Sequence, residues 1–483
     1  MDLEIPTASA SCYWSSTEFA SLVCKDIRRK RRFERVAADF LNQPGVSIPN
    51  ACGDWAGTKA CYRLFDHQEV TAERILEAHR DATLARLAAD DEDGCLLVIQ
   101  DTSALNFSTR SGMEGLGPTG SHGSQKTPGL FLHGHLVVGE SGTVHGMPGG
   151  DLYARKGRDD DPAGKRNSQP LHEKESQRWL EGWNKAQRLW QDLGGNRKVL
   201  CVADREADIY ELLAASQQQR AKTGDGAGLL IRSRHDRQLD REEGGSLWQI
   251  PEDLTIVAEL EVEIPRGKQG LRSRRAKLTV RAGQVLLAVP AHKRKYLGLK
   301  ESVGLWFLEV IETDPPAGAA PVCWRLLTTE PVMSATDAKR LVACYALRWR
   351  IEMLFRILKS GCRAEQRQVQ TVEKLKALIA LDLVIACHLL AMTMQARSKP
   401  DDPADRWLAR EEWEALCVQA AGGGPAPALC PSIKNAVLMI AKLGGFLARK
   451  SDGDPGSDVL WRGLAKLKIY AEAWKIFSQG ICG

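Results

Sequence analysis

The stretch KVLCVADREADIYELL, residues 198–213, decides the fold. Its first half is a short, continuous apolar run that ends in an acid, Asp204, which is typical of a strand buried on both faces of a sheet. Its second half runs directly into a helix. The run CLLVIQD, residues 95–101, has the same form and ends at Asp101. Two such strands, with helices between and after them, predict a mixed α/β core.

Changes of pattern divide the rest of the chain. Residues 1–70 predict a small helical unit, and residues 71–370 carry the α/β pattern. Within the latter, residues 228–332 alternate apolar and polar positions in several runs, which indicates a β-rich insertion in the α/β domain. Residues 371–483 predict a helical C-terminal region.

The most apolar stretch begins at Ala377 and is interrupted by Asp382 and His388. A charge at the centre of a membrane helix costs at least about 2.5 kcal/mol, so we expect a buried core helix there and no membrane span. The amino terminus contains acids and no long apolar run, which argues against a secretory signal. The thirteen cysteines form no CxxC pair and predict neither a zinc site nor a disulfide framework. We therefore expect a cytoplasmic protein.

The net charge of +5 is only mildly basic, so any case for nucleic-acid binding rests on local clusters of cations. The runs KDIRRKRRFER, residues 25–35, and RGKQGLRSRRAK, residues 266–277, are such clusters. Each is either a phosphate-binding surface or a solvated charge run.

The segment YALRWRIEMLFRILKSG, residues 345–361, predicts one helix, because it has no Pro or Gly before Gly361. At about 100° per residue, one face carries a single acid among cations and a phenol: Tyr345, Arg348, Glu352, Arg356 and Lys359. This face is either solvated and laced with ion pairs, or it lines a site.

Asp101, Asp204 and Glu352 are the candidate catalytic acids. Each aspartate alone could be a turn former or a helix cap. Three carboxylates in one cleft, however, would raise one another's pKa unless a cation neutralises them. Carboxylate oxygens suit Mg²⁺ or Mn²⁺, and two such ions about 4 Å apart can serve phosphoryl transfer. Cations beside Glu352 would then position a phosphate backbone.

The pattern Y-x2-R-x3-E-x6-K, formed by Tyr345, Arg348, Glu352 and Lys359, resembles the signature of the insertion-sequence-four family of bacterial DDE transposases. DREADIYELL is similar to the family's second-acid motif, and DIRRKRRFERVA, AGTKACYRLF, IQDTSALNF and AKLGGFLARK match in the right order. The resemblance implies a ribonuclease-H-like catalytic core, with Asp101, Asp204 and Glu352 as ligands of two Mg²⁺ ions. It also implies an N-terminal DNA-end-binding domain and a C-terminal dimerisation region.

Family members cut their element out of DNA and join its 3′-hydroxyl ends to a target, so the resemblance implies cut-and-paste transposition, with a hairpin intermediate in this branch. The partners would be double-stranded DNA and a second copy of the chain. Two other functions stay open: a DNA-binding repressor derived from a transposase, which would not need the acids, and a metal-dependent nuclease without strand transfer.

The resemblance also implies DNA contacts, at Tyr345, Arg348, Lys359, Trp324, Arg232, Arg234, Arg28, Arg29, Arg32, Tyr62 and Arg63. Trp324 would stack on an unpaired base, although a core tryptophan on a strand is the plain alternative. Arg232 and Arg234 occupy alternate positions of an expected strand and would share one face, unless that face is a solvated edge.

Other titratable residues predict no site. We expect His133, His135 and His145 not to bind metal, because the first two share one face of an expected strand. Asp208 is interpreted as a first-turn helix acid. The Gly-rich loop of residues 115–129, the terminal repeat and the target preference cannot be assigned from the sequence.

Overall fold

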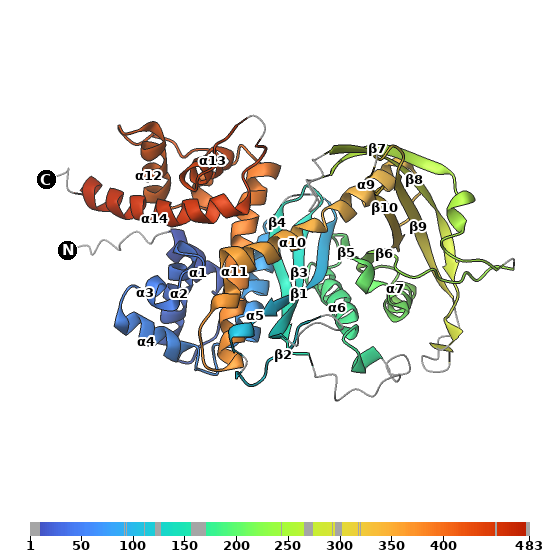
Figure 1. Cartoon of the computed structure of the whole chain (residues 1–483), viewed down its shortest axis with the longest axis horizontal. Helices are drawn as coiled ribbons and strands as arrows, with labels where there is room; N and C mark the ends of the chain where they lie inside the picture. The colour runs from blue at the N-terminus through green and yellow to red at the C-terminus, as the bar shows by residue number, and fades with distance from the viewer. Residues whose placement is uncertain are drawn as a thin grey trace.

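The computed structural model describes residues 10–90, 92, 94–110, 112–120, 127–155, 171–242, 244–264, 274–291, 293–294, 302–316, 318, 320–449 and 452–479. Part of the Gly-rich loop (121–126) and most of the second basic run (266–273) lie outside these residues. Figure 1 shows a central sheet between helices, with N-terminal helices on one side of α11 and C-terminal helices above them.

One mixed sheet runs through the molecule in the order β2-β3-β1-β5-β6-β10-β9-β8-β7, and β4 pairs with β3. Strand β1 pairs with β3 antiparallel and with β5 parallel, and β6 is parallel to β5. Three antiparallel strands followed by two strands parallel to the first confirm the ribonuclease-H-like core. The strands are β1 (Leu96–Asn106), β2 (Gly117–Pro118), β3 (Pro128–Gly139), β4 (Val144–Tyr153), β5 (Val199–Ala203), β6 (Gly228–Arg232), β7 (Ile256–Ile264), β8 (Arg274–Leu287), β9 (Val303–Glu312) and β10 (Cys323–Thr328).

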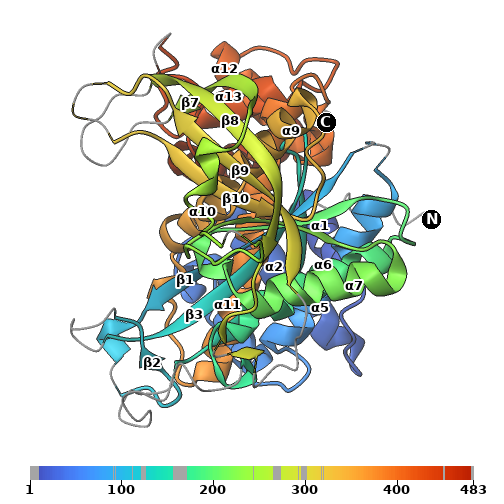
Figure 2. The same ribbon diagram turned by 90° about the vertical axis from the view of Figure 1, so that its right-hand side faces the viewer.

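The β-rich insertion extends the core sheet. Strand β6 is itself a core strand, and β10 pairs with it antiparallel, so the meander of β7 to β10 continues from its free edge. Figure 2 shows these strands rising from the core as a curved ribbon. The insertion therefore places Trp324, on β10, two strands from the strand that precedes Asp204.

Alternation along β1 assigns its side chains to two cores. Leu97 and Ile99 belong to the core that includes α9, α10 and α11, whereas Leu96 and Val98 belong to the core beneath α6 and α7. Asp101 continues the series of Leu97 and Ile99 and so faces α10. The helices of this domain are α5 (Ala72–Ala88), α6 (Gln177–Asp192), α7 (Tyr210–Thr223), α9 (Ala335–Ala346), α10 (Trp349–Arg356) and α11 (Val372–Ser398).

Helices form both ends of the chain, as expected. The N-terminal helices are α1 (Ala10–Glu18), α2 (Ile27–Asn42), α3 (Ile48–Cys52) and α4 (Trp55–Leu64). Side chains cap the first turns of α2 and α5: Asp26 accepts from Arg28 N and Thr71 accepts from Arg74 N. The C-terminal helices α12 (Arg410–Ala421), α13 (Ile433–Leu443) and α14 (Ser457–Gln479) share a core of their own with the end of α11.

Helix α11 is long and apolar enough to cross a membrane, but 89% of its most apolar window is buried inside the molecule, as predicted for a core helix. Its buried acid, Asp382, is neutralised by Arg367, whose Nε lies 2.8 Å from Asp382 Oδ2. Arg367 also donates to the carbonyl of Val46, 2.9 Å away, and so ties the N-terminal helices to this helix.

Candidate active site

Asp101 lies in the middle of β1, although the sequence pattern suggested the end of a strand. Antiparallel pairing with β3 continues past it to Asn106, whereas the parallel pairing with β5 stops at Gln100, opposite Ala203. Asp101 is therefore the first residue of β1 beyond its parallel partner, and Asp204 directly follows that partner's last residue. The end of the parallel pairing brings these two carboxylates together.

Asp204 caps a short 3₁₀ turn, Arg205–Ala207, and its Oδ1 accepts from Glu206 N at 2.8 Å. This turn separates β5 from α7, so the strand does not run directly into the helix as predicted.

Asp208 precedes α7, and the expectation of a first-turn helix acid is wrong. Its buried carboxylate accepts from Arg234 N (2.7 Å) and His235 N (2.9 Å) and pairs with Arg237. These contacts fix the loop after β6 and leave Asp208 no lone pair to spare for a ligand.

The segment from Tyr345 to Gly361 is not one helix. Helix α9 ends at Ala346, a tight turn follows in which Arg348 N donates to Tyr345 O at 3.0 Å, and α10 begins at Trp349. After α10 the backbone forms a π-helical turn, Ile357–Gly361, of the kind that is frequent at functional sites. Because the π-helical turn holds more residues than an α-helical turn, a regular helical wheel misplaces the side chains in this part of the segment.

Arg356 accordingly does not join the face that carries Glu352. Arg356 Nη2 lies 2.8 Å from Asp458 Oδ2 and so faces α14. Lys359 is half-buried, and burial lowers its pKa although the nearby Glu365 acts in the other direction.

Close packing sets α10 against the sheet. Gly134 on β3 is the partner of Asp101, and a Cβ at that position would lie 3.0 Å from Phe355 Cε1. The absence of a side chain at Gly134 thus lets Phe355 lie on the sheet beside Asp101. Phe355 and its neighbour Leu354 are both buried.

Arg348 joins two of the three acids. Its Nη1 lies 3.1 Å from Asp101 Oδ2 and its Nη2 lies 2.7 Å from Glu352 Oε1, so one guanidinium bridges β1 and α10. The pKa of Arg348 is raised by its contacts with Tyr345, Glu352 and Asp101, against the opposing effect of burial. The acids thus meet around a protein cation, and a bound metal ion would have to compete with it.

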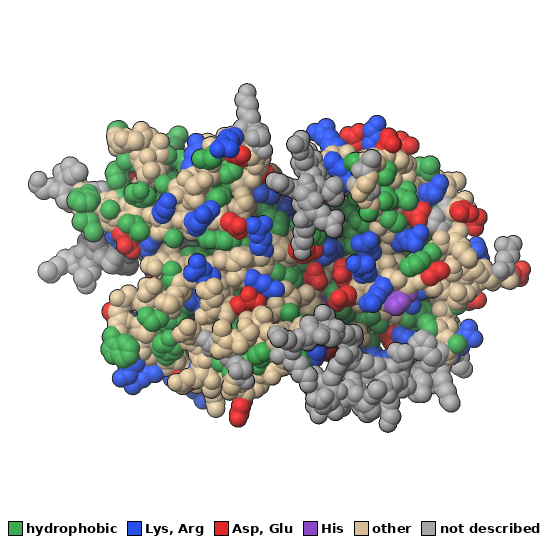
Figure 3. All heavy atoms as spheres, viewed as in Figure 1, with side chains coloured by type: hydrophobic (Ala, Val, Ile, Leu, Met, Phe, Trp, Pro, Cys, Tyr) green, Lys and Arg blue, Asp and Glu red, His purple; other side chains and the backbone are tan. Residues whose placement is uncertain are grey.

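The electrostatics of Asp101 indicate a crowded acidic site. Burial and the Asp204 carboxylate raise the pKa of Asp101 to about 7, while the Thr102 amide and Arg348 act in the opposite direction. Glu352 raises it further. In Figure 3 acidic side chains gather in a hollow near the middle of the molecule, with Lys and Arg side chains around them. A bound cation would stabilise the ionised form of such a group.

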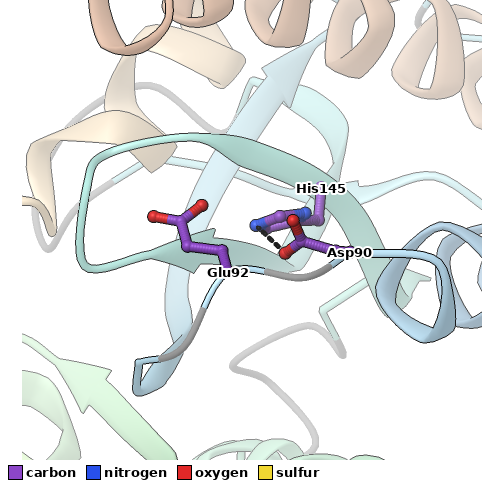
Figure 4. Close-up of side chains that lie close together, drawn as sticks. All are labelled: Asp90, Glu92 and His145. Atoms are coloured by element: carbon purple, nitrogen blue, oxygen red, sulfur yellow. Dashed lines mark ion pairs between the residues drawn. The ribbon is translucent and has the colours of Figure 1, made fainter.

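The triad is nevertheless not a preformed ligand set. Within the described part of the chain, one group of His, Cys, Asp or Glu side chains has all its ligand atoms within 4.8 Å of one another, and it consists of Asp90, Glu92 and His145 (Figure 4). The oxygens of Asp101, Asp204 and Glu352 are therefore spaced more widely than that, as expected where Arg348 lies between two of them.

The three histidines differ in their surroundings. His133 is buried between Thr102 Oγ1 (2.7 Å) and Gln100 Oε1 (3.1 Å), and burial lowers its pKa to about 3. Because Gln100 Oε1 can only accept, the ring carries its proton on Nε2 and accepts the Thr102 hydroxyl on Nδ1. His135 is buried beside it. Both are core histidines, whereas His145 lies beside two acids.

The predicted DNA-contacting residues of the core surround the triad. Trp324 is half-buried, with its ring 5.2 Å from that of Tyr345 in an edge arrangement. Tyr345 is itself buried, and burial raises its pKa. Arg232 ends β6 and donates to Cys323 O, 2.9 Å away. Arg234 lies beyond the strand and is exposed, so the two arginines do not share a strand face as expected.

The N-terminal arginines fall into two kinds. Arg28 is 88% exposed at its side chain and pairs only with its neighbour Asp26 in the described structure, and Arg63 is exposed at the end of α4. Arg29 pairs with Glu69 and helps to close the helical unit. Arg32 lines a small cavity with Arg35 and Asp39, and Tyr62 packs against the core.

Sequence reasoning missed Trp349. Its side chain is 54% exposed, and the Arg348 guanidinium lies 5.9 Å from the centre of its ring. An exposed indole next to the acids is the signal that could have identified it, since large aromatic side chains on a polar surface often stack on ligands.

Comparison with protein families gives three matches. Residues 11–70 match the transposase DNA-binding family, residues 176–388 the transposase DDE domain, and residues 384–479 the transposase Tn5 dimerisation domain. The DDE match includes Asp204 and Glu352 and begins after Asp101. The three matches follow one another along the chain; residues 71–175 lie between the first two, and only residues 480–483 lie beyond the last.

Proposed function

Because the chain is a DDE transposase that resembles the Tn5 transposase, binds DNA, forms homodimers and uses divalent metal, we propose that it excises its own element and joins the freed 3′-hydroxyl ends to target DNA. The proposal follows the insertion-sequence-four pattern and places the protein in the bacterial cytoplasm, at the nucleoid. A hairpin intermediate is part of it.

One observation carries the catalytic part of this proposal. Asp101 and Asp204 adjoin where β1 and β5 stop pairing, and Arg348 links Asp101 to Glu352. Burial and mutual repulsion raise the pKa of Asp101 to about 7, which is the environment expected of carboxylates that await a cation. These donors fit Mg²⁺ or Mn²⁺, which prefer carboxylate oxygen.

Asp101, Asp204 and Glu352 would hold two such ions, which when bound would supply the Lewis acidity for in-line displacement at phosphorus. The other residues bind and orient DNA. Arg348, released from the acids, would bind a phosphate bidentately, and Lys359 would add a second cation on the same side. Trp324 and Trp349 offer indole faces for unstacked bases, worth about 1 to 3 kcal/mol each. Together these contacts would fix the scissile phosphate against the acids.

DNA ends would be held first by the N-terminal helices. The side chains of Arg28 and Arg63 are exposed and would meet phosphates, Arg28 in place of its neighbour Asp26, whereas Arg29 serves mainly to fix the unit through Glu69. In a dimer joined through the C-terminal region, each N-terminal unit would bind the DNA end that the partner cleaves. Cleavage would then depend on assembly with both ends.

The test is an assay with purified protein, Mg²⁺ and a duplex that ends in the element's own terminal repeat. We expect nicks, hairpins and joined products in sequence on a denaturing gel. Binding without any product would indicate a repressor, and nicks without joining would indicate a nuclease. A duplex with a scrambled repeat is the control, and equal cleavage of both duplexes would contradict end recognition.

A further inference from the structure

A second group of metal-ligand side chains lies beside the start of β1, whereas the proposed catalytic acids lie at its middle and beyond. Asp90 and Glu92 follow α5, shortly before Leu96 begins β1, and His145 is the second residue of β4 (Figure 4). Asp101 is about five residues further along β1, which at about 3.3 Å per residue is about 17 Å. The two groups are therefore too far apart to share one ion.

His145 has a buried nitrogen with nothing bonded to it. The residue is only 8% exposed, and its Nε2 has no hydrogen-bond partner in the described part of the chain. A neutral imidazole nitrogen is the form of histidine that binds metal. A buried ring nitrogen in this state normally has a partner, and its lack of one points to a ligand.

Glu92 also directs an oxygen without a hydrogen bond toward the space beside His145 Nε2. Its Oε2 is also buried without a hydrogen bond. A Cβ built on Gly139 would lie 3.3 Å from His145 Nε2 and 3.6 Å from Glu92 Oε2, so both atoms face the space beside this glycine. Asp90 Oδ2 completes the group, 3.8 Å from His145 Nε2.

The spacing suits one ion after a small contraction. The three ligand atoms lie within 4.8 Å of one another. Around an ion with tetrahedral bonds of about 2.0 Å, ligand atoms would be about 3.3 Å apart. Side-chain rotations that move each atom by about 1 Å would close the difference.

We propose that Asp90, Glu92 and His145 bind one Zn²⁺ ion, separate from the metal used in catalysis. One imidazole nitrogen with two carboxylate oxygens favours zinc over magnesium, which prefers oxygen alone. Water would supply the fourth ligand. This site goes beyond the proposed function, since neither DNA cleavage nor strand transfer requires it.

Two protein cations adjoin the group, and they differ in how firmly they are held. Arg197 Nη2 lies 3.1 Å from Asp90 Oδ2 and can keep that contact, since a carboxylate oxygen has a second lone pair for the ion. Lys399 Nζ lies 3.7 Å from Glu92 Oε2 and 4.0 Å from Asp90 Oδ1, too far to hydrogen-bond well, and its side chain is 40% exposed. Lys399 is therefore the cation that zinc displaces into solvent.

The site joins two elements. Asp90 and Glu92 follow α5, and His145 belongs to the hairpin of β3 and β4. Zinc would fasten the end of α5 to this hairpin. The hairpin in turn contacts the end of α11 through Thr143 Oγ1 and Ser398 Oγ, 3.0 Å apart.

The experiment uses the full chain with Asp204→Asn and Glu352→Gln, so that the catalytic acids are disabled. The protein is stripped with EDTA and dialysed against Zn²⁺, and bound zinc is counted by plasma mass spectrometry. We expect about one ion per chain and a rise in melting temperature on loading. His145→Asn and Glu92→Gln in this background should each weaken zinc binding at least about tenfold. His172→Asn and Glu77→Gln, at exposed positions, are the matched controls.

A fourth variant separates a zinc site from an ordinary group of ion pairs. Lys399→Met removes the competing cation, so it should tighten zinc binding severalfold, and the Co²⁺-loaded protein should show an absorption band that His145→Asn abolishes. Absence of bound zinc, equal zinc in His145→Asn and His172→Asn, or weaker binding in Lys399→Met would overturn the proposal. Melting curves in EDTA establish that each variant is folded.

Discussion

The two acidic groups along β1, one before its first residue and one at its middle, are neutralised in different ways. At Asp101 and Glu352 a single guanidinium makes short hydrogen bonds to both acids, and the three proposed ligands are all carboxylates. At Asp90 and Glu92 the Lys399 nitrogen lies 3.7 Å or more from the carboxylate oxygens, and the third proposed ligand is a neutral imidazole. Under the proposed function the first group would keep its cation until DNA and metal arrive, whereas the second is already close to the shape of a metal site.

The difference shows that acid clusters within one sheet need not serve one purpose. The type of ligand atom decides which metal ion is preferred. The strength with which a protein cation binds the same carboxylates decides when that ion can enter. A group meant for catalysis benefits from a bound arginine, because Arg348 can turn from the acids to a phosphate at the moment that substrate binds. A group that fastens a fold gains nothing from such a competitor.

The largest expected contrast is in cleavage. Asp101→Asn, Asp204→Asn or Glu352→Gln should each reduce cleavage of a terminal-repeat duplex by at least about a thousandfold, since each removes a proposed ligand of the reacting metal. Glu92→Gln should leave the initial rate of the same reaction within about twofold. The measurement is a gel time course, with end binding followed by mobility shift. Retained cleavage in any of the first three variants would remove that residue from the catalytic group.

The competing cations give the next contrast, in metal affinity. Arg348→Met frees two carboxylates from their guanidinium, so Mn²⁺ binding, followed by calorimetry without DNA, should tighten by about tenfold, or about 1.4 kcal/mol. Cleavage should nevertheless fall, because the phosphate contact is lost with the same side chain. Weaker Mn²⁺ binding in Arg348→Met would mean that the arginine organises the acids and does not compete with the ion. Arg356→Met, whose parent side chain pairs with Asp458, is the control.

The smallest contrast is in the pH dependence of the metal-free protein. Asp101 has a pKa of about 7 when folded, above its unfolded value of about 3.9, so its effect is to lower the free energy of unfolding as pH rises from about 4 to 7. His145 has a pKa of about 4 when folded, below its unfolded value of about 6.5, so it lowers that free energy as pH falls from about 6.5 to 4. The two slopes are opposite over the same range.

Urea unfolding in EDTA at several pH values tests this pair. Asp101→Asn should be more stable than the parent at pH 8 by about 1 to 3 kcal/mol, and the gain should vanish near pH 4. His145→Asn should show the reverse trend. Its free energy of unfolding relative to the parent should be highest near pH 4, and the gain should vanish near pH 8. Parallel pH profiles for Asp101→Asn and the parent would show that this carboxyl is not perturbed.

The sequence predicted the sheet well, because its signals there are local. Continuous apolar runs marked β1 and β5, and alternation marked the strands from β7 to β10. Asp101 and Asp204 were predicted as site residues because each ends one of the continuous apolar runs. What the sequence could not reveal is where pairing stops: Asp101 lies within β1, and only the register with β5 explains why it meets Asp204. Register depends on contacts between distant segments and leaves no local mark.

The helical segment around Glu352 shows the opposite case. Strong helix formers predicted one straight helix, yet the chain turns at Arg348 and widens at Ile357. Tertiary contacts override propensity there: Phe355 lies on Gly134, and Trp461 of α14 packs against Gly361. A wheel drawn through this segment placed Arg356 on the catalytic face, where it is not found. Asp90, Glu92 and His145 were missed because they come from three separate places in the chain.

Helix α11 has a consequence for how the molecule can be divided. Its first turns pack with the α/β core, and its end, at Met392 and Ala396, packs with the C-terminal helices. A fragment that ends at the predicted domain boundary near residue 370 would lose a helix that covers the α/β core and would expose a broad apolar surface. Proteolysis near residue 370 should therefore not release a soluble catalytic fragment. Helix α11 belongs to both cores, so its loss would unfold the regions on either side of it.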